Sequence, residues 1–133
     1  MKKWMKILLL ILAIPIVTVV SFGIYITWGL DQSAHLNIGN VNISSLSDGT
    51  YIGTNNNGRW SNSLEVDVEN HRVKDIRLVK DVTFPLPEIA EKIFKSVTDN
   101  QKVNVDAVSG ATVTSKAYLR SIENALMSGA KKQ

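Results

Sequence analysis

The sequence has no cysteine among its 133 residues. This absence excludes disulfide bonds, thiol nucleophiles, thiolate metal clusters and lipid attachment through a cysteine. Any redox chemistry therefore has to come from a bound organic cofactor. Histidine is almost as scarce, since His35 and His71 are the only two. They lie too far apart in sequence for metal-ligand spacing, so we expect both to be exposed and predict no metal site.

The chain after residue 6 also lacks an excess of positive charge. The chain has 15 Lys and Arg against 12 Asp and Glu, and Lys2, Lys3 and Lys6 account for the whole difference. The remaining segments are neutral overall, so no nucleic-acid partner is expected. The sequence also lacks a P-loop, a defensible Ser-His-Asp set and paired carboxylates with hydrolytic spacing, so no catalytic residues are assigned.

One long apolar run is present. Ile7 to Trp28 is 22 residues without a charge, and at about 1.5 Å per residue it can cross a hydrocarbon core of about 30 Å. A cleaved signal peptide is the alternative, because residues 1–6 form a basic leader. The run is longer than the roughly 7–15 residues of a signal peptide's apolar region, and no clear Ala-x-Ala site follows. We therefore predict an uncleaved signal anchor over residues 7–28.

The positions of the first lysines predict the topology. Residues 1–6 are expected in the cytoplasm by the positive-inside rule, which makes the chain a single-pass protein of the cell membrane. The C-terminal domain is then extracytoplasmic, and the lipid bilayer is a partner. Residues 29–47, rich in Asn, Ser and Gly, are predicted to be a tether. Alternating apolar pairs leave open that part of this segment lies along the domain.

Residues 48–128 are predicted to form one domain. Asp48 to Thr54 resembles a turn leading into a strand, and Ser63 to Glu69 alternates apolar with acidic residues, as in a half-buried strand. Asn70 and His71 fit a two-residue turn before a returning strand, Arg72 to Lys80. The acidic row of the first hairpin strand is interpreted as a solvated face. The pattern therefore predicts an antiparallel hairpin.

Two helices complete the predicted domain. Pro87 fits the first position of a helix whose apolar residues recur at helical spacing, and Lys116 to Met127 is the second helical stretch. Between them, Val103 and Val105 indicate a short strand. Gly129 is expected to cap the last helix, which leaves 129–133 as a tail. The predicted fold class is α+β: a small antiparallel sheet with two packed helices, preceded by one transmembrane helix.

Small and hydroxyl residues gather where the last helix is expected to begin. The stretch runs from Asp106 to Ser115. Free backbone N–H groups and the helix dipole favour an anion there. Gly110 and Ala111 permit close approach of a ligand, and the Thr112 hydroxyl could bond a phosphate or be esterified by it. The alternative is an ordinary helix N-terminus in which such residues serve only as caps.

This stretch resembles the flavinylation motif of the FMN-binding domain family. The match covers seven consecutive positions, Asp106-Ala107-Val108-Ser109-Gly110-Ala111-Thr112. Such domains occur in the flavoprotein subunits of sodium-pumping NADH:quinone oxidoreductase and in membrane-anchored bacterial redox proteins. The resemblance implies FMN as the cofactor, held on Thr112 by a phosphoester that a separate flavin transferase makes.

The resemblance also implies roles for the neighbouring residues. Ser109, Gly110 and Ala111 would shape the phosphate seat, and Thr114 and Ser115 would supply caps or phosphate bonds. Asp106 would brace the loop through backbone N–H bonds, or be read by the flavin transferase.

Aromatic contacts to the flavin ring are less specific. Asn55 to Trp60 replaces the more glycine-rich loop of the family. Trp60 could stack on the ring or simply cover the edge of the core. Phe84 and Leu86 are candidate ring contacts by resemblance.

Three functions are compatible with these residues. The first is an extracytoplasmic electron carrier or redox-complex component with covalent FMN, an unidentified electron donor and an unidentified acceptor. The second is a noncovalent FMN-binding module, and the third is a cofactor-free structural or interaction domain. The intact motif favours the first over the third, and the first is favoured over a stand-alone enzyme.

Overall fold

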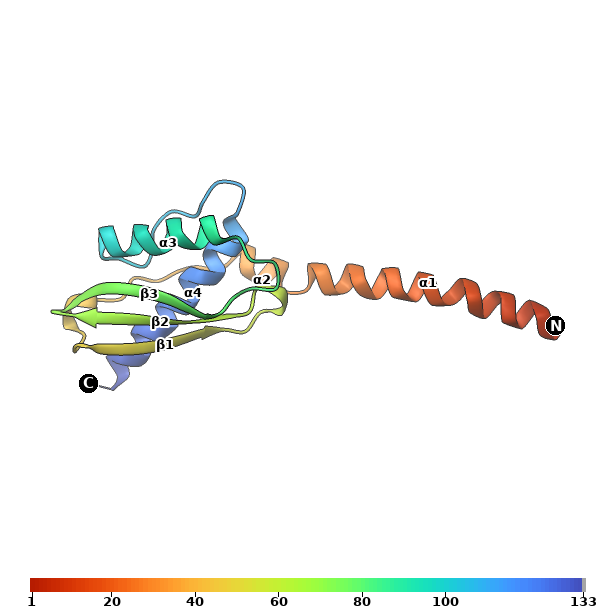
Figure 1. The fold of residues 1–133 in the computed structure, drawn as a ribbon, viewed down its shortest axis with the longest axis horizontal. Helices are drawn as coiled ribbons and strands as arrows, with labels where there is room; N and C mark the ends of the chain where they lie inside the picture. Colours follow the sequence, from red (N-terminus) through yellow and green to blue (C-terminus); the bar gives the residue numbers. More distant parts are fainter. Residues whose placement is uncertain (133) are drawn as a thin grey trace.

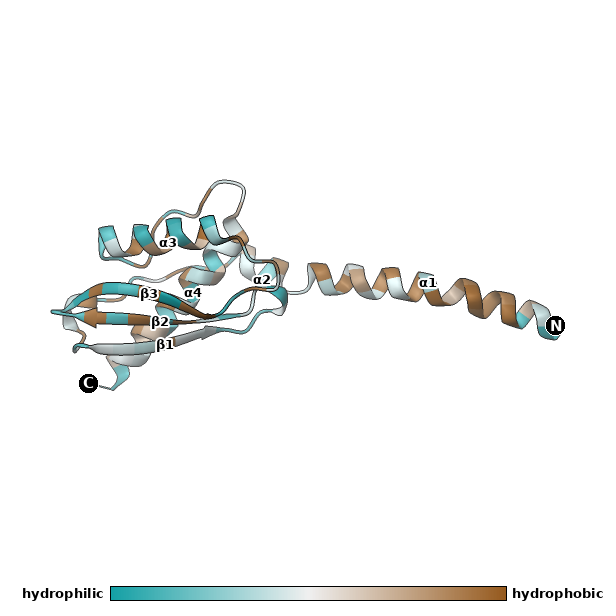
Figure 2. Cartoon of the chain, viewed as in Figure 1, coloured by the Kyte–Doolittle hydropathy of each residue, from teal (hydrophilic) through white to brown (hydrophobic). Residues whose placement is uncertain are grey.

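The N-terminal helix projects from the rest of the chain. A computed structural model describes residues 1–132, and Gln133, the end of the predicted tail, lies outside the described residues. Helix α1 spans Lys3–Thr27, and none of its residues is buried. Figure 1 shows it leaving one end of the domain, and Figure 2 shows that most of its residues are hydrophobic. The helix is long and apolar enough to cross a membrane.

The domain contains one three-stranded antiparallel sheet in the order β1-β2-β3. The strands are β1 (Gly49–Asn55), β2 (Asn62–Glu69) and β3 (Arg72–Lys80). Between β2 and β3, Asn70 and His71 have positive φ angles of 53° and 59°. This geometry matches the predicted two-residue hairpin turn. The side chains of β2 that were predicted to face the core are all buried: Leu64, Val66 and Val68.

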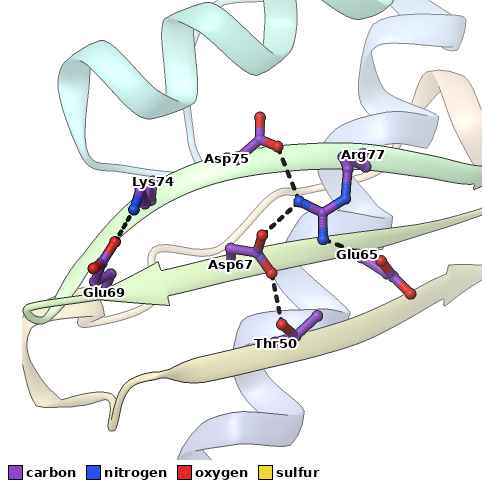
Figure 3. A network of polar contacts seen from close by, with 7 residues as sticks. All are labelled: Thr50, Glu65, Asp67, Glu69, Lys74, Asp75 and Arg77. Atoms are coloured by element: carbon purple, nitrogen blue, oxygen red, sulfur yellow. Dashed lines mark hydrogen bonds and ion pairs between the residues drawn. The ribbon is translucent and has the colours of Figure 1, made fainter.

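The outer face of the sheet carries the acidic row, and Arg77 lies among its carboxylates (Figure 3). The Arg77 guanidinium bonds Asp67 at 2.5 Å, Asp75 at 3.0 Å and Glu65 at 3.3 Å. Its hydrogen bond to Asp67, with a second from Thr50, lowers the pKa of the Asp67 carboxyl. The acidic residues are therefore engaged by a cation on the exposed face of the sheet.

Two long helices cover the other face. Helix α3 (Pro87–Asn100) begins with a proline in its first turn, as predicted, and packs against β3 and α4. Helix α4 (Thr112–Lys131) packs across β1 and β2. Its buried face includes Tyr118, Leu119, Ile122 and Leu126. The domain is therefore α+β, which confirms the predicted fold class.

Helix α4 is longer at both ends than the predicted Lys116 to Met127. Gly129, predicted as the C-cap, lies inside the helix, so that prediction is wrong. A Cβ atom at Gly129 would lie 2.7 Å from Cε1 of Tyr51. The glycine therefore provides space for a tyrosine ring of β1, and the helix continues past it.

The connection from α3 to α4 contains no strand. Val103 and Val105 were predicted to form one, but the backbone N–H of Val105 donates to the carbonyl of Val103 at 2.8 Å. A bond across two residues closes a tight turn. Val103 is fully buried, so its apolar character serves the core and not a sheet.

The segment predicted as a tether packs onto the domain. It contains helix α2 (Leu30–Ala34) and a short 3-10 helix, η1 (Ile43–Ser45). The side chains of Ile43 and Leu46 belong to the core. This segment therefore follows the domain surface, the arrangement that its alternating apolar pairs left open.

Candidate functional site

A cavity of about 530 Å³ lies beside the N-terminus of α4. Four segments form its wall: the start of α2, the 3-10 helix η2 (Gly58–Trp60), the loop between β3 and α3, and residues 110–114. In Figure 1 these loops lie at the end of the domain from which α1 emerges. The lining residues are Leu30, Arg59, Trp60, Val82, Phe84, Leu86, Gly110, Ala111, Thr112, Val113 and Thr114.

The motif makes a tight turn before α4. The N–H of Ala111 donates to the carbonyl of Val108 at 3.0 Å, and Gly110 has a φ of 80°. This left-handed conformation favours glycine. An added Cβ at Gly110 would meet no atom within 4 Å, so the turn borders open space.

Helix α4 starts without a side-chain cap. Its N-cap residue is Ala111, which cannot accept a capping bond, and Thr112 is the first helical residue. The first regular helical bond of this turn comes from the N–H of Ser115 to the carbonyl of Ala111, at 2.9 Å. The N–H groups before it lack intrahelical partners. The start of α4 therefore differs from an ordinary capped helix N-terminus. Its free backbone N–H groups are typical of a helix N-terminus that binds an anion.

The structure brings some of the predicted site residues together. Gly110, Ala111, Thr112 and Thr114 line the cavity, with Thr112 exposed and Thr114 largely buried. Ser109 lines an adjoining hollow that also includes Leu86, Gly110 and Ala111.

Two predicted site residues lie elsewhere. Ser115 is fully buried, and its Oγ accepts a 3.0 Å bond from the N–H of Val108, so its hydroxyl braces the motif turn. Asp106 is exposed in a separate hollow with Ser96 and Asn100. No hydrogen bond of its carboxylate is found within residues 1–132, so bracing of the loop by Asp106 stays a prediction without support from these contacts.

Aromatic and apolar side chains form another part of the wall. Trp60 is only 4% exposed and belongs to the core, while Phe84 and Leu86 are 50% and 45% exposed. Trp60 therefore covers the edge of the core and also lines the cavity. Phe84 and Leu86 are exposed at its mouth.

Arg59 is a cavity residue that the sequence analysis did not assign. Its guanidinium carbon lies 4.0 Å from the centre of the Trp60 ring and 5.5 Å from that of Phe84. Among the buried side-chain nitrogen and oxygen atoms of residues 1–132, Arg59 Nε alone lacks a hydrogen-bond partner. Arg59 is only partly buried, but a buried N–H donor without a partner is costly unless a ligand or water satisfies it. The sequence feature that could have identified Arg59 as a site residue is its position next to Trp60, in a loop that departs from the family pattern.

The loop between β3 and α3 is held in place by Asp81. Its Oδ1 accepts bonds from the N–H of Val82 at 2.7 Å and from the hydroxyl of Tyr118 at 2.6 Å. Burial, with the bond to Asp81 as the second cause, raises the pKa of Tyr118 well above its usual value. The phenol therefore stays protonated and keeps donating to this loop.

These features fit FMN. The cavity volume falls in the range of about 300–1,000 Å³ that is usual for cofactor sites. An uncapped helix start suits a phosphate, the aromatic wall suits a flat ring, and Arg59 has an unsatisfied donor in the same cavity.

Comparison with known proteins gives an independent result. The family model described as FMN-binding domain matches residues 24–127. The match includes the seven-residue motif, the whole sheet and the segment predicted as a tether. No curated protein matches the chain.

Proposed function

The chain belongs to the FMN-binding domain family, with FMN as its cofactor, and from this premise we propose that it is a membrane-anchored electron carrier with FMN covalently attached to Thr112. Bound FMN supplies one- and two-electron transfer chemistry, while the protein binds and presents it. The single observation that carries the proposal is the placement of Thr112. Its exposed hydroxyl stands at the uncapped start of α4, on the wall of the cavity.

The other motif residues then have distinct roles. Ser109, Gly110 and Ala111 form the turn that leads into the free backbone N–H groups of residues 112–114, which would bind the phosphate, and Thr114 lines the same wall. Ser115 holds the turn through Val108. These contacts orient the phosphate next to the Thr112 hydroxyl.

Asp106 is proposed to serve the flavin transferase. Its carboxylate is exposed outside the cavity lining, where a separate enzyme could contact it. A carboxylate next to the FMN phosphate would be repelled by it. The position of Asp106 away from the phosphate site therefore supports its recognition by the flavin transferase.

Arg59 is proposed to provide positive charge for the FMN phosphate. Its buried Nε has no partner, and within residues 1–132 its guanidinium makes no ion pair. Hydrogen bonds between a guanidinium and a phosphate are charge-assisted and strong.

A carrier fits this cavity better than an enzyme with its own substrate. Arg59 is the one ionisable residue among those that line the cavity in the described part of the chain. Arginine keeps its proton, so no residue of the wall is suited to general acid or base chemistry. The electron donor and the acceptor are therefore proposed to be separate partners.

The membrane orientation follows from the sequence. Helix α1 is proposed to span the cell membrane once, with Lys2, Lys3 and Lys6 on the cytoplasmic side and the domain outside. The apolar character and exposure of α1 support the span, and the orientation rests on the three lysines alone.

The proposal can be tested on the full-length protein, produced with and without a flavin transferase. After denaturing electrophoresis, flavin fluorescence that stays with the chain only when the transferase is present would support covalent attachment. Flavin that leaves on denaturation in both preparations would favour the noncovalent module. If the protein is recovered in the membrane fraction but carries no flavin in either preparation, the carrier role would be contradicted.

A further inference from the structure

The cavity lies very close to the end of the apolar helix. Leu30 forms part of its wall and is only two residues beyond Trp28, where the predicted membrane span of residues 7–28 ends. Two residues span at most about 7 Å of extended chain. The headgroup layer is about 5–8 Å thick on each side of a bilayer. If α1 spans the membrane, one wall of the cavity is therefore at the level of the headgroups.

Hydrogen bonds fix this end of the domain to the chain that leaves the membrane. Asn57 Nδ2 donates to the carbonyl of Gly29 at 3.1 Å and to Ser33 Oγ at 2.5 Å. Both Asn57 and Ser33 are buried. Lys116 Nζ donates to the carbonyl of Ala34 at 2.8 Å. These bonds hold the residues that directly follow α1 against the domain, so the cavity stays within a few residues of the end of that helix.

Exposed apolar side chains gather at the end of the domain that holds the cavity. Beyond α1, seven large apolar side chains are exposed in the described chain, and four of them lie at this end. Their exposed fractions are 68% for Trp28, 41% for Leu30, 50% for Phe84 and 45% for Leu86. We call these four residues the apolar rim. Aromatic and leucine side chains are typical of protein surfaces that enter the membrane interface.

We propose that the apolar rim rests in the lipid headgroup layer, so that the FMN cavity opens at the surface of the bilayer. The continuity of the rim with α1 identifies lipid as its occupant. This inference rests on the proposed membrane span of α1. It implies that the electron partners of FMN reach it at the membrane surface and not across open solution.

Depth measurements in a membrane can test the proposal directly. Since the chain has no native cysteine, single nitroxide labels can be introduced into full-length protein as Phe84→Cys, Leu86→Cys, Ala130→Cys and Val17→Cys. Ala130 is exposed near the C-terminus, on the far side of the domain, and serves as the control (Figure 1). Val17 lies in α1 and serves as the membrane reference. Each variant is placed in phosphatidylcholine nanodiscs, and label collisions with oxygen and with a water-soluble nickel complex are compared.

We expect labels at positions 84 and 86 to show an oxygen-to-nickel collision ratio several-fold above that at position 130, and below that at position 17. Equal ratios at positions 84, 86 and 130, with a lipid-like ratio at position 17, would overturn the rim proposal but leave the span intact. A water-like ratio at position 17 would contradict the span itself. If Phe84→Cys fails to retain FMN, Leu86→Cys decides the result.

Discussion

Tyr118 of α4 donates a 2.6 Å hydrogen bond to Oδ1 of Asp81, which begins the loop between β3 and α3. This loop carries Val82, Phe84 and Leu86 to the wall of the cavity. The helix that starts at the proposed attachment residue thus also holds a second segment of the cavity wall. One side-chain pair therefore links the phosphate seat to the aromatic side of the site.

Removing this hydrogen bond should loosen the cavity. Tyr118→Phe is expected to lower the free energy of unfolding by about 1–2 kcal/mol, because a partly buried hydrogen bond to a charged group is lost. It should also weaken noncovalent FMN binding, since the β3–α3 loop loses its tie to α4. Urea unfolding and FMN titration of detergent-solubilised full-length protein measure the two effects.

Tyr51→Phe provides the matched control. The Tyr51 hydroxyl donates to the carbonyl of Ser47 at 2.6 Å, and its hydrogen bond is exposed. The same chemical change should therefore leave FMN affinity unaltered. Equal losses of FMN affinity in both variants would refute the proposed link.

Because the pKa of Tyr118 is raised in the folded protein, the free energy of unfolding should change with pH in the alkaline range. In the unfolded chain the phenol loses its proton near pH 10, whereas in the folded protein burial and the bond to Asp81 keep it protonated to higher pH. Its contribution to stability is complete below pH 10 and declines above it, because the unfolded state then binds fewer protons. Unfolding free energies at several pH values should fall less steeply above pH 10 in Tyr118→Phe. An unchanged slope would argue against this assignment.

Strand β1 lies so close to α4 at Gly53 that no side chain should fit there. A Cβ there would lie 2.6 Å from the backbone nitrogen of Ala125 and 2.8 Å from its Cβ. Since backbone atoms of a packed helix cannot move aside cheaply, Gly53→Ala should destabilise the domain by about 1–3 kcal/mol or more. The change is read from the urea midpoint. Gly23→Ala, at a position with nothing within 4 Å, is the control, and similar midpoints for the two variants would contradict this explanation.

The charge of Arg59 should matter for FMN and not for riboflavin, which lacks the phosphate. Arg59→Gln is expected to weaken noncovalent FMN binding about tenfold or more, because a charge-assisted bond is worth about 1.5–3 kcal/mol. Titrations of protein made without a transferase measure both ligands. Arg72→Gln, at an exposed residue of the hairpin, should have no effect. An equal loss of affinity for riboflavin would show that Arg59 does not act on the phosphate.

The sequence predicts best what depends on neighbouring residues. The hairpin follows from strict alternation and from a turn at Asn70, and α3 follows from Pro87 and a periodic apolar stripe. The cofactor follows from a contiguous motif. These features need no knowledge of distant contacts.

The errors concern residues whose role is set by a distant partner. Gly129 resembles a helix cap until Tyr51 is known to pack over it. The segment after α1 lies along the domain, an arrangement that its sequence left open, because the bond from Asn57 to Ser33 that helps to hold it there joins residues 24 positions apart. Arg59 becomes conspicuous only when its neighbours leave Nε without a partner.

The central claim is that Thr112 carries FMN, and the most direct test is the intact mass of the denatured protein after coexpression with a flavin transferase. We predict that the natural chain gains the mass of FMN less one water, that Thr112→Ala gains nothing, and that Thr114→Ala, at the next hydroxyl on the same wall, is still modified. Thr112→Ser, which keeps a hydroxyl, should retain some attachment. Full modification of Thr112→Ala, or its loss in Thr114→Ala alone, would contradict the assignment.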